Sequence, residues 1–254
     1  MAKQILFWVL AFLITAGSAV YQRLTGPTYP KSGSVTLVGK TIKYNLERSH
    51  SSSSNYVVEI ETNDPEIIGE LNWRPFQSNG EFNSVKMTGD KVLKAELPAR
   101  QRLQKWQYYI RLQKGQEEII IPGDNGITIR FKDDVPIWVL IPHVIFMFGA
   151  MLISTRTAFE IFNKTPNLYK LTIWNLVFLF IGGFPLGFAM NGYAFGEMWG
   201  GIPFGNDITD NKTLIAFIGW LVAFYMIKKN HLPKLFVVLA AILMLIVYLI
   251  PHSV

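Results

Sequence analysis

Two histidines are placed where imidazole could bind a cofactor. His143 lies inside a long apolar segment, and His252 follows the last apolar segment. Imidazole is a common ligand of haem iron and of metal ions, and an ionisable side chain inside a membrane is costly unless it has a role. The pair is therefore a candidate site for haem b or a metal ion. The alternative is that His143 is a neutral, hydrogen-bonded packing residue and that His252 is solvated.

Residues 191–212 combine acidic, amide and aromatic side chains with several glycines. Asp207, Asp210 and Asn211 offer the oxygen ligands that Ca²⁺ prefers, although their spacing differs from that of an EF-hand loop. The structural alternative is that Asp210 or Thr209 caps the next helix. The aromatic residues of the loop are suited to interactions at a membrane interface, and we expect them to pack against the domain that residues 27–135 form. They are Tyr193, Phe195, Trp199 and Phe204.

A basic turn, Arg100, Arg102 and Lys105, stands beside Trp106. It is either a solvated hairpin end or a site for a ligand or partner. The sequence has no P-loop, GxSxG or HExxH motif, and no His or Ser next to the acidic pair completes a catalytic arrangement. We therefore predict no catalytic residues, and a non-enzymatic protein is favoured over an enzyme.

Long apolar segments contain His143 and flank both His252 and residues 191–212. Residues 5–21 are uncharged and follow Lys3, which fits either an N-terminal transmembrane anchor or a cleaved signal peptide. Four more apolar segments follow, at residues 137–155, 171–190, about 213–227, and 235–250. A helix needs about 20 apolar residues to cross the hydrocarbon core of a bilayer. The pattern predicts about five transmembrane helices.

Basic residues alternate between the two sides of these segments. The loops on one side contain Lys3, Arg156, Lys164, Lys170, Lys228, Lys229 and Lys234, whereas the loop at residues 191–211 contains no Lys or Arg. Lys and Arg in short loops mark the cytoplasmic side of a membrane. We therefore expect a multi-pass protein of the bacterial cytoplasmic (inner) membrane, with the N-terminus inside and with residues 22–135 and the C-terminus in the periplasm.

Residues 22–135 alternate apolar and polar side chains in short runs rich in Val, Ile, Tyr and Trp. Gly, Pro, Asn and Ser clusters separate these runs, which indicates seven or eight strands of an antiparallel sandwich. The stretch from Leu97 to Leu112 resembles the E–F corner of immunoglobulin and fibronectin type III domains, without their cysteine pair.

The composition excludes several classes of protein. The formal charge is +6, but residues 22–135 hold 16 basic against 14 acidic side chains, so no face for binding nucleic acid is indicated. The sequence has no cysteine, which excludes disulfides, thiolate zinc sites and iron–sulfur clusters. The excess of basic over acidic residues instead indicates the orientation of the chain in the membrane.

Two segments resemble a known group of proteins. Residues 129–151 (IRFKDDVPIWVLIPHVIFMFGAM) and 193–213 (YAFGEMWGGIPFGNDITDNKT) resemble a family of bacterial polytopic membrane proteins that pair an extracytoplasmic immunoglobulin/fibronectin III-like β-sandwich with a helical membrane part. The resemblance implies an architecture and adds no activity and no catalytic residue.

The expected fold class is a membrane α-helical bundle of about five transmembrane helices with an inserted all-β, immunoglobulin-like sandwich. The expected parts are the anchor at residues 1–22, the periplasmic sandwich at 27–135, and a four-helix membrane domain at 136–254. The leading hypothesis is an accessory or scaffold protein that contacts the lipid bilayer and binds a membrane or periplasmic protein partner or an envelope component, with no cofactor and no nucleic acid. The alternative is a haem- or metal-binding redox subunit or a transport subunit of a membrane complex.

Overall fold

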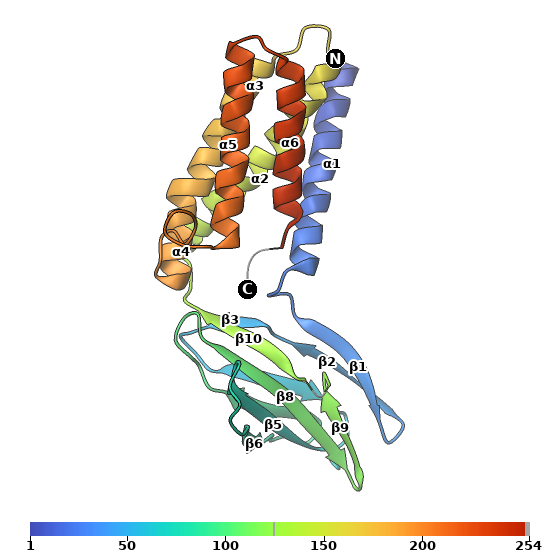
Figure 1. The fold of residues 1–254 in the computed structure, drawn as a ribbon. Helices are drawn as coiled ribbons and strands as arrows, with labels where there is room; N and C mark the ends of the chain where they lie inside the picture. Colours follow the sequence, from blue (N-terminus) through green and yellow to red (C-terminus); the bar gives the residue numbers. More distant parts are fainter. Residues whose placement is uncertain (124, 252–254) are drawn as a thin grey trace. The chain divides into compact units, whose positions relative to one another are not determined.

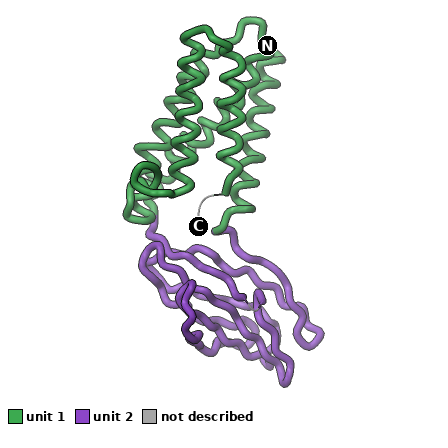
Figure 2. Tube along the Cα trace, viewed as in Figure 1, with its two compact units in different colours: residues 1–27, 135–254 green, residues 28–134 purple. Residues whose placement is uncertain are grey.

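The chain divides into two compact units in a computed structural model that describes residues 1–123 and 125–251 (Figures 1 and 2). The helical unit consists of Met1–Pro27 and the chain from Val135 onward. The β unit is Thr28–Asp134. Each unit is described below by itself.

The β unit is built from short strands whose burial alternates. In β4, Tyr56–Glu61, every second residue is buried, as expected for a strand with one face on a core. The other strands are β1 (Lys31–Leu37), β2 (Lys40–Leu46), β3 (Ser49–Ser51), β5 (Ile68–Pro75), β6 (Asn83–Lys86), β7 (Val92–Leu97), β8 (Lys105–Lys114), β9 (Glu117–Ile121) and β10 (Ile127–Lys132).

Strand β8 is the centre of the largest sheet (Figure 1). Within the described residues this sheet has the order β3-β10-β8-β5-β6, and β9 also pairs with β8. Strands β1 and β2 form a separate hairpin, and β4 and β7 form a second two-stranded sheet. One apolar core joins all three sheets, and it includes the fully buried Tyr108 and Phe131. The Tyr108 hydroxyl donates to the carbonyl of Glu47 at 2.8 Å, so this buried polar group has a partner.

The expected fold class, a helical membrane bundle with an inserted immunoglobulin-like sandwich, is wrong. The helices lie at both ends of the chain, and the strands between them form three small sheets instead of one sandwich of that type. Alternation along a strand predicts which face is buried, but it does not predict which strand pairs with which, because pairing depends on contacts far apart in sequence.

The helical unit begins with α1 (Ala2–Thr25), and the other helices follow the strands. They are α2 (Ile137–Phe159), the 3₁₀ turn η1 (Glu160–Phe162), α3 (Leu168–Ile181), the π-helical turn η2 (Gly182–Leu186), α4 (Gly187–Phe195), α5 (Ile208–Lys228) and α6 (Pro233–Leu249). Pro185 lies inside η2 and has no N–H to donate, which accounts for the break in the α-helical pattern.

Four of the described helical segments are long and apolar enough to cross a membrane. They are Ala2–Thr25, Ile137–Phe162, Leu168–Phe195 and Ile208–Lys228. Their outward faces keep large apolar side chains exposed, for example Phe12, Trp138 and Trp174, which fits a lipid surrounding. Helix α6 is also apolar but has only 17 residues. The fold therefore fits a membrane protein.

Candidate functional site

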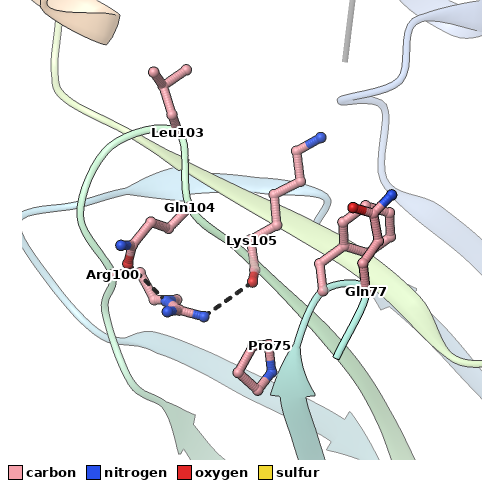
Figure 3. Close-up of a pocket in the computed structure, with 7 residues that line it drawn as sticks. Pro75, Gln77, Arg100, Leu103, Gln104 and Lys105 are labelled. Atoms are coloured by element: carbon pink, nitrogen blue, oxygen red, sulfur yellow. Dashed lines mark hydrogen bonds between the residues drawn. The ribbon is translucent and has the colours of Figure 1, made fainter. Parts of the chain in front are cut away.

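The β unit has an open cavity of about 420 Å³ beside the beginning of β8 (Figure 3). Two segments form it: the end of β5 with the turn that follows, and the loop that leads from β7 into β8. Its lining consists of Pro75, Phe76, Gln77, Arg100, Leu103, Gln104 and Lys105, so it contains two cations and no carboxylate. Arg100 and Lys105 belong to the basic turn identified in the sequence.

Backbone hydrogen bonds hold both walls of the cavity in place. The amide of Phe76 donates to the carbonyl of Lys105 at 3.2 Å, which joins the two walls. The amide of Leu103 donates to the carbonyl of Phe131 at 2.9 Å, and the amide of Phe131 donates to the carbonyl of Gln104 at 3.0 Å. The cavity is therefore part of the sheet scaffold, although loops supply its side chains.

The Arg100 guanidinium is fixed by neutral groups (Figure 3). Its Nε donates to Oε1 of Gln104 at 2.9 Å, and one terminal nitrogen donates to the backbone carbonyl of Lys105 at 3.3 Å. The guanidinium also lies over the ring of Trp106, 4.1 Å from the ring centroid. Trp106 is in turn held by a 2.8 Å hydrogen bond from its Nε1 to the carbonyl of Pro98. The guanidinium of Arg100 is thus oriented by uncharged groups, and it forms no ion pair within the described part of the chain.

Lys105 lies in a positive environment. Its Nζ is 5.3 Å from the ring centroid of Phe76, and no carboxylate among the described residues pairs with it. The antiparallel register places Arg130 of β10 directly opposite Lys105. Burial, and then the nearby charge of Arg130, lower the pKa of the Lys105 ammonium below its ordinary value. The third basic residue of the turn, Arg102, does form an ion pair: its guanidinium lies 3.3 Å from the carboxylate of Asp133.

A hydrogen bond within the helical unit explains the position of His143. Its Nδ1 is 2.9 Å from the carbonyl of Gly182, the first residue of η2. The π-helical turn leaves this carbonyl available, and a neutral imidazole that donates to it satisfies both groups. His252 lies outside the described residues. Haem ligation by the two histidines therefore stays a prediction.

The acidic loop is held together by its own hydrogen bonds. Asp210 accepts from the side chain of Asn191 at 2.9 Å and from the amide of Gly200 at 2.7 Å. Asp207 caps α5 by accepting from the amides at the start of the helix, and Asn211 accepts from the amide of Ile202 at 2.8 Å. In the described part of the chain, no group of three or more His, Cys, Asp or Glu side chains could hold a metal ion. A metal ion at this loop stays a prediction.

The four aromatic residues of this loop have different surroundings. Trp199 stacks on Phe184, with ring centroids 5.9 Å apart, and meets the edge of Phe188 at 5.5 Å. Tyr193 meets Trp138 edge to face at 6.1 Å, whereas Phe204 is 82% exposed. Phe195 is half-buried in the last turn of α4. Packing of the loop against the β unit, which we expected from its composition, stays a prediction.

A buried ion pair in the helical unit was not identified from the sequence. Arg156 and Glu160 are both about 5% exposed and lie 2.5 Å apart. Arg156 also donates to the side chain of Gln4 in α1, and Glu160 accepts from the amide of Asn167 at 3.1 Å. Arg156 and Glu160 are four residues apart, which is the spacing of ion pairs on a helix. The sequence did not reveal the pair because Arg156 was expected in the loop that follows residues 137–155.

Comparison with known proteins adds no relative: no protein-family model matches the chain, and no curated protein is significantly similar to it.

Proposed function

We propose that this chain is a membrane-anchored binding protein of the bacterial inner membrane. The helical unit acts as the anchor, and the β unit is presented in the periplasm, where it binds a protein partner or a component of the cell envelope. The cavity at the beginning of β8 is the binding site. No group in the proposal performs a chemical reaction.

The anchoring role is supported by the apolar helices and by the distribution of charge. Four segments have the length and composition of membrane spans. Basic residues gather in the loops that precede α1, join α2 to α3 and join α5 to α6, which favours a cytoplasmic position for these loops. The β unit follows the opposite end of α1 and therefore belongs to the periplasmic side in this proposal.

Helix α6 acts as a fifth crossing in this proposal, despite its length. Gln22 near the end of α1 donates to the carbonyl of Tyr248 near the end of α6. Lys212 in the first turn of α5 donates to the carbonyl of Ile250 at 2.7 Å. The end of α6 thus lies at the level where α1 ends and α5 begins. A helix of 17 residues is at the lower limit for crossing a bilayer.

One observation carries the binding role: the β unit exposes a cavity with two cations and no carboxylate in its lining, held by the sheet scaffold. Concave sites with a few oriented polar groups are the usual binding sites of proteins.

Site-directed cross-linking in intact cells tests the proposal. Leu103, 46% exposed at the cavity, would be replaced by photoactivatable p-benzoylphenylalanine in the full chain. We expect one discrete adduct from the periplasmic side. The matched control is the same replacement of Val57 in β4, which is 43% exposed and does not line the cavity. Identical patterns from both positions, or adducts only with cytoplasmic proteins, would contradict the proposal.

A further inference from the structure

We propose that the loop between α4 and α5, residues 196–207, is inserted in the periplasmic leaflet of the bilayer, where its exposed apolar side chains contact phospholipid. The inference rests on the proposed anchoring role of the helical unit and adds a lipid contact that no transmembrane helix supplies. Four features of the loop support it: the depth of its tryptophan, the bonding of its backbone, the place of its charges, and its exposed apolar side chains.

The loop folds back alongside the helices. Trp199 packs on Phe184 and Phe188, and both of these rings belong to the membrane-length segment Leu168–Phe195. Phe184 also meets Phe217 of α5, which is nine residues beyond the start of that helix, roughly 13 Å along its axis. The indole therefore lies beside the apolar spans, at a depth that lipid occupies around a membrane protein.

The irregular backbone of the loop has hydrogen-bond partners of its own. The amide of Ile202 donates to the Asn211 side chain at 2.8 Å, and the amides of Phe204 and Gly205 both donate to the carbonyl of Gly201 at 2.9 Å. Non-helical backbone at membrane depth is tolerated only where its polar groups are satisfied. These bonds therefore lower the cost of placing the loop against lipid.

The charged groups at this end of the helical unit are held together. Asp210 and Lys212 are only 7% and 8% exposed. A Cβ added at Gly200 would lie 3.7 Å from the carboxylate of Glu197 and 3.8 Å from that of Asp210, and 3.2 Å from the Cβ of Asp207. The acidic residues of the loop thus gather around one glycine, which suits a loop whose remaining surface meets lipid.

The exposed side chains of the loop are large and apolar. Met198 is 69% exposed, Ile202 58% and Phe204 82%. Exposed apolar side chains grouped in one segment mark a surface that contacts a membrane or another protein. The depth of Trp199 favours lipid, because a soluble partner does not reach the level of the membrane spans, and an apolar segment at this level lies in the interface between headgroups and acyl chains.

Spin labelling tests the insertion, because the sequence has no cysteine and a single introduced cysteine is labelled selectively. Phe204→Cys would carry a nitroxide in the full chain in phosphatidylcholine nanodiscs. Power saturation measures its collisions with oxygen, which concentrates in lipid, and with a water-soluble nickel chelate. The controls are Phe12→Cys, at a residue 61% exposed on α1, and Val57→Cys, at a residue 43% exposed in β4. We expect the oxygen-to-nickel ratio at Phe204 to be several-fold higher than at Val57 and close to that at Phe12.

Two results would overturn the inference. One is a ratio at Phe204 as low as that at Val57, which would place the loop in water. The other is poor access of both reagents to Phe204, the result expected if the loop packs against the β unit. Ile202→Cys repeats the measurement at a second exposed position, and the inference requires the lipid result at each labelled variant that retains the wild-type melting temperature.

The Phe12 control separates this inference from the proposed function. A low ratio at Phe12 would contradict the anchoring role of the helical unit itself. A high ratio at Phe12 with a low ratio at Phe204 would leave the anchor standing and overturn only the insertion of the loop. The cross-link at Leu103 tests the binding role of the β unit and is independent of both results.

Discussion

Asp64 shows how a single carboxylate organises the β unit. Its side chain is only 5% exposed, and it accepts hydrogen bonds from Lys114 at 2.7 Å and from Lys40 at 2.8 Å. The amide of Glu66 donates to it at 3.1 Å. These bonds, first that of Lys114 and then that of Lys40, hold the pKa of Asp64 well below its ordinary value. The charged carboxylate therefore joins β2, β8 and the turn before β5.

Asp64 makes the stability of the β unit depend on pH. A carboxyl group whose pKa is lowered by folding stabilises the protein above its unfolded-state pKa, about 3.9, and loses this effect as pH falls through the folded-state pKa. We expect Asp64→Asn to unfold at lower urea concentration at pH 7, and its deficit to shrink as the pH is lowered below about 4.

Pulse proteolysis of the full chain in urea measures this effect, with thermolysin at neutral pH and pepsin in acid. The control is Asp90→Asn, an exposed aspartate of the same unit with no ion pair among the described residues. A deficit of Asp64→Asn that is the same at every pH would show that the charge of Asp64 is not the cause.

At the level of single residues, the sequence predicts part of the candidate site. Arg100 and Lys105 stand together beside Trp106, and their proximity follows from the sequence alone. Arg130 could not be connected with them, because it comes opposite Lys105 only through the pairing of β8 with β10. Phe76 likewise reaches the cavity through the pairing of β5 with β8. Register between strands is a property of the fold and not of any one segment.

Among the elements, the loop between α4 and α5 is closed by an aromatic cluster. Trp199 packs on Phe184 of η2 and on Phe188 of α4, and its Nε1 donates to the carbonyl of Ile202 at 3.1 Å. Phe184 also meets Phe217 of α5 at 5.1 Å. The loop is thereby attached to the helices on both sides of it.

Removing this indole should loosen the loop. Trp199→Ala deletes a half-buried ring with protein neighbours, and we expect a loss of about 2 kcal/mol, less than that of a fully buried aromatic residue. Phe12→Ala is the matched control, because Phe12 is 61% exposed in α1 and lipid can replace its ring. Melting of the detergent-solubilised chain measures both variants. Equal changes would show that the aromatic cluster does not stabilise the loop.

Secondary structure was predicted unevenly along the chain. The apolar helices and the strands rich in Val, Ile and Tyr follow from hydrophobicity and alternation. Strand β1 (KSGSVTL) was not expected, because Gly and Ser are poor strand formers. Gly33 is accommodated there because it faces Tyr44, whose hydroxyl would lie 2.3 Å from an added Cβ. An aromatic ring over a glycine stabilises the pair across strands.

On the scale of the whole chain, the Arg156 network joins segments that are distant in sequence. Arg156 bonds to Glu160 and to Gln4, and the ring of Phe7 stacks on that of Phe159 at 5.6 Å. Lys3 donates to the carbonyl of Phe162 at 2.7 Å. These contacts make α1 an integrated part of the helical unit, and we expect peptides from α1 to be retained in the mature protein when it is digested and measured by mass spectrometry.

A double-mutant cycle tests the ion pair. Arg156→Met leaves Glu160 buried without its cation, and we expect a loss of about 3–5 kcal/mol. Arg156→Met combined with Glu160→Met removes both charges and should cost less than the single change. Thermal unfolding in detergent provides the comparison. A double variant that loses as much stability as Arg156→Met alone, or more, would contradict this explanation.

The contacts of α1 also constrain the order of events during synthesis. Its partners belong to α2 and α6, and Gln22 bonds to Tyr248. At about 5 to 20 residues per second, a ribosome completes α6 on the order of ten to fifty seconds after α1 enters the membrane. Through that interval the Gln22 side chain lacks its partner, whereas Gln4 can meet Arg156 as soon as α2 has been made. The packing of α1 against α6 is thus the last of its contacts to form, and a chain interrupted before Pro233 would keep Gln22 without its partner.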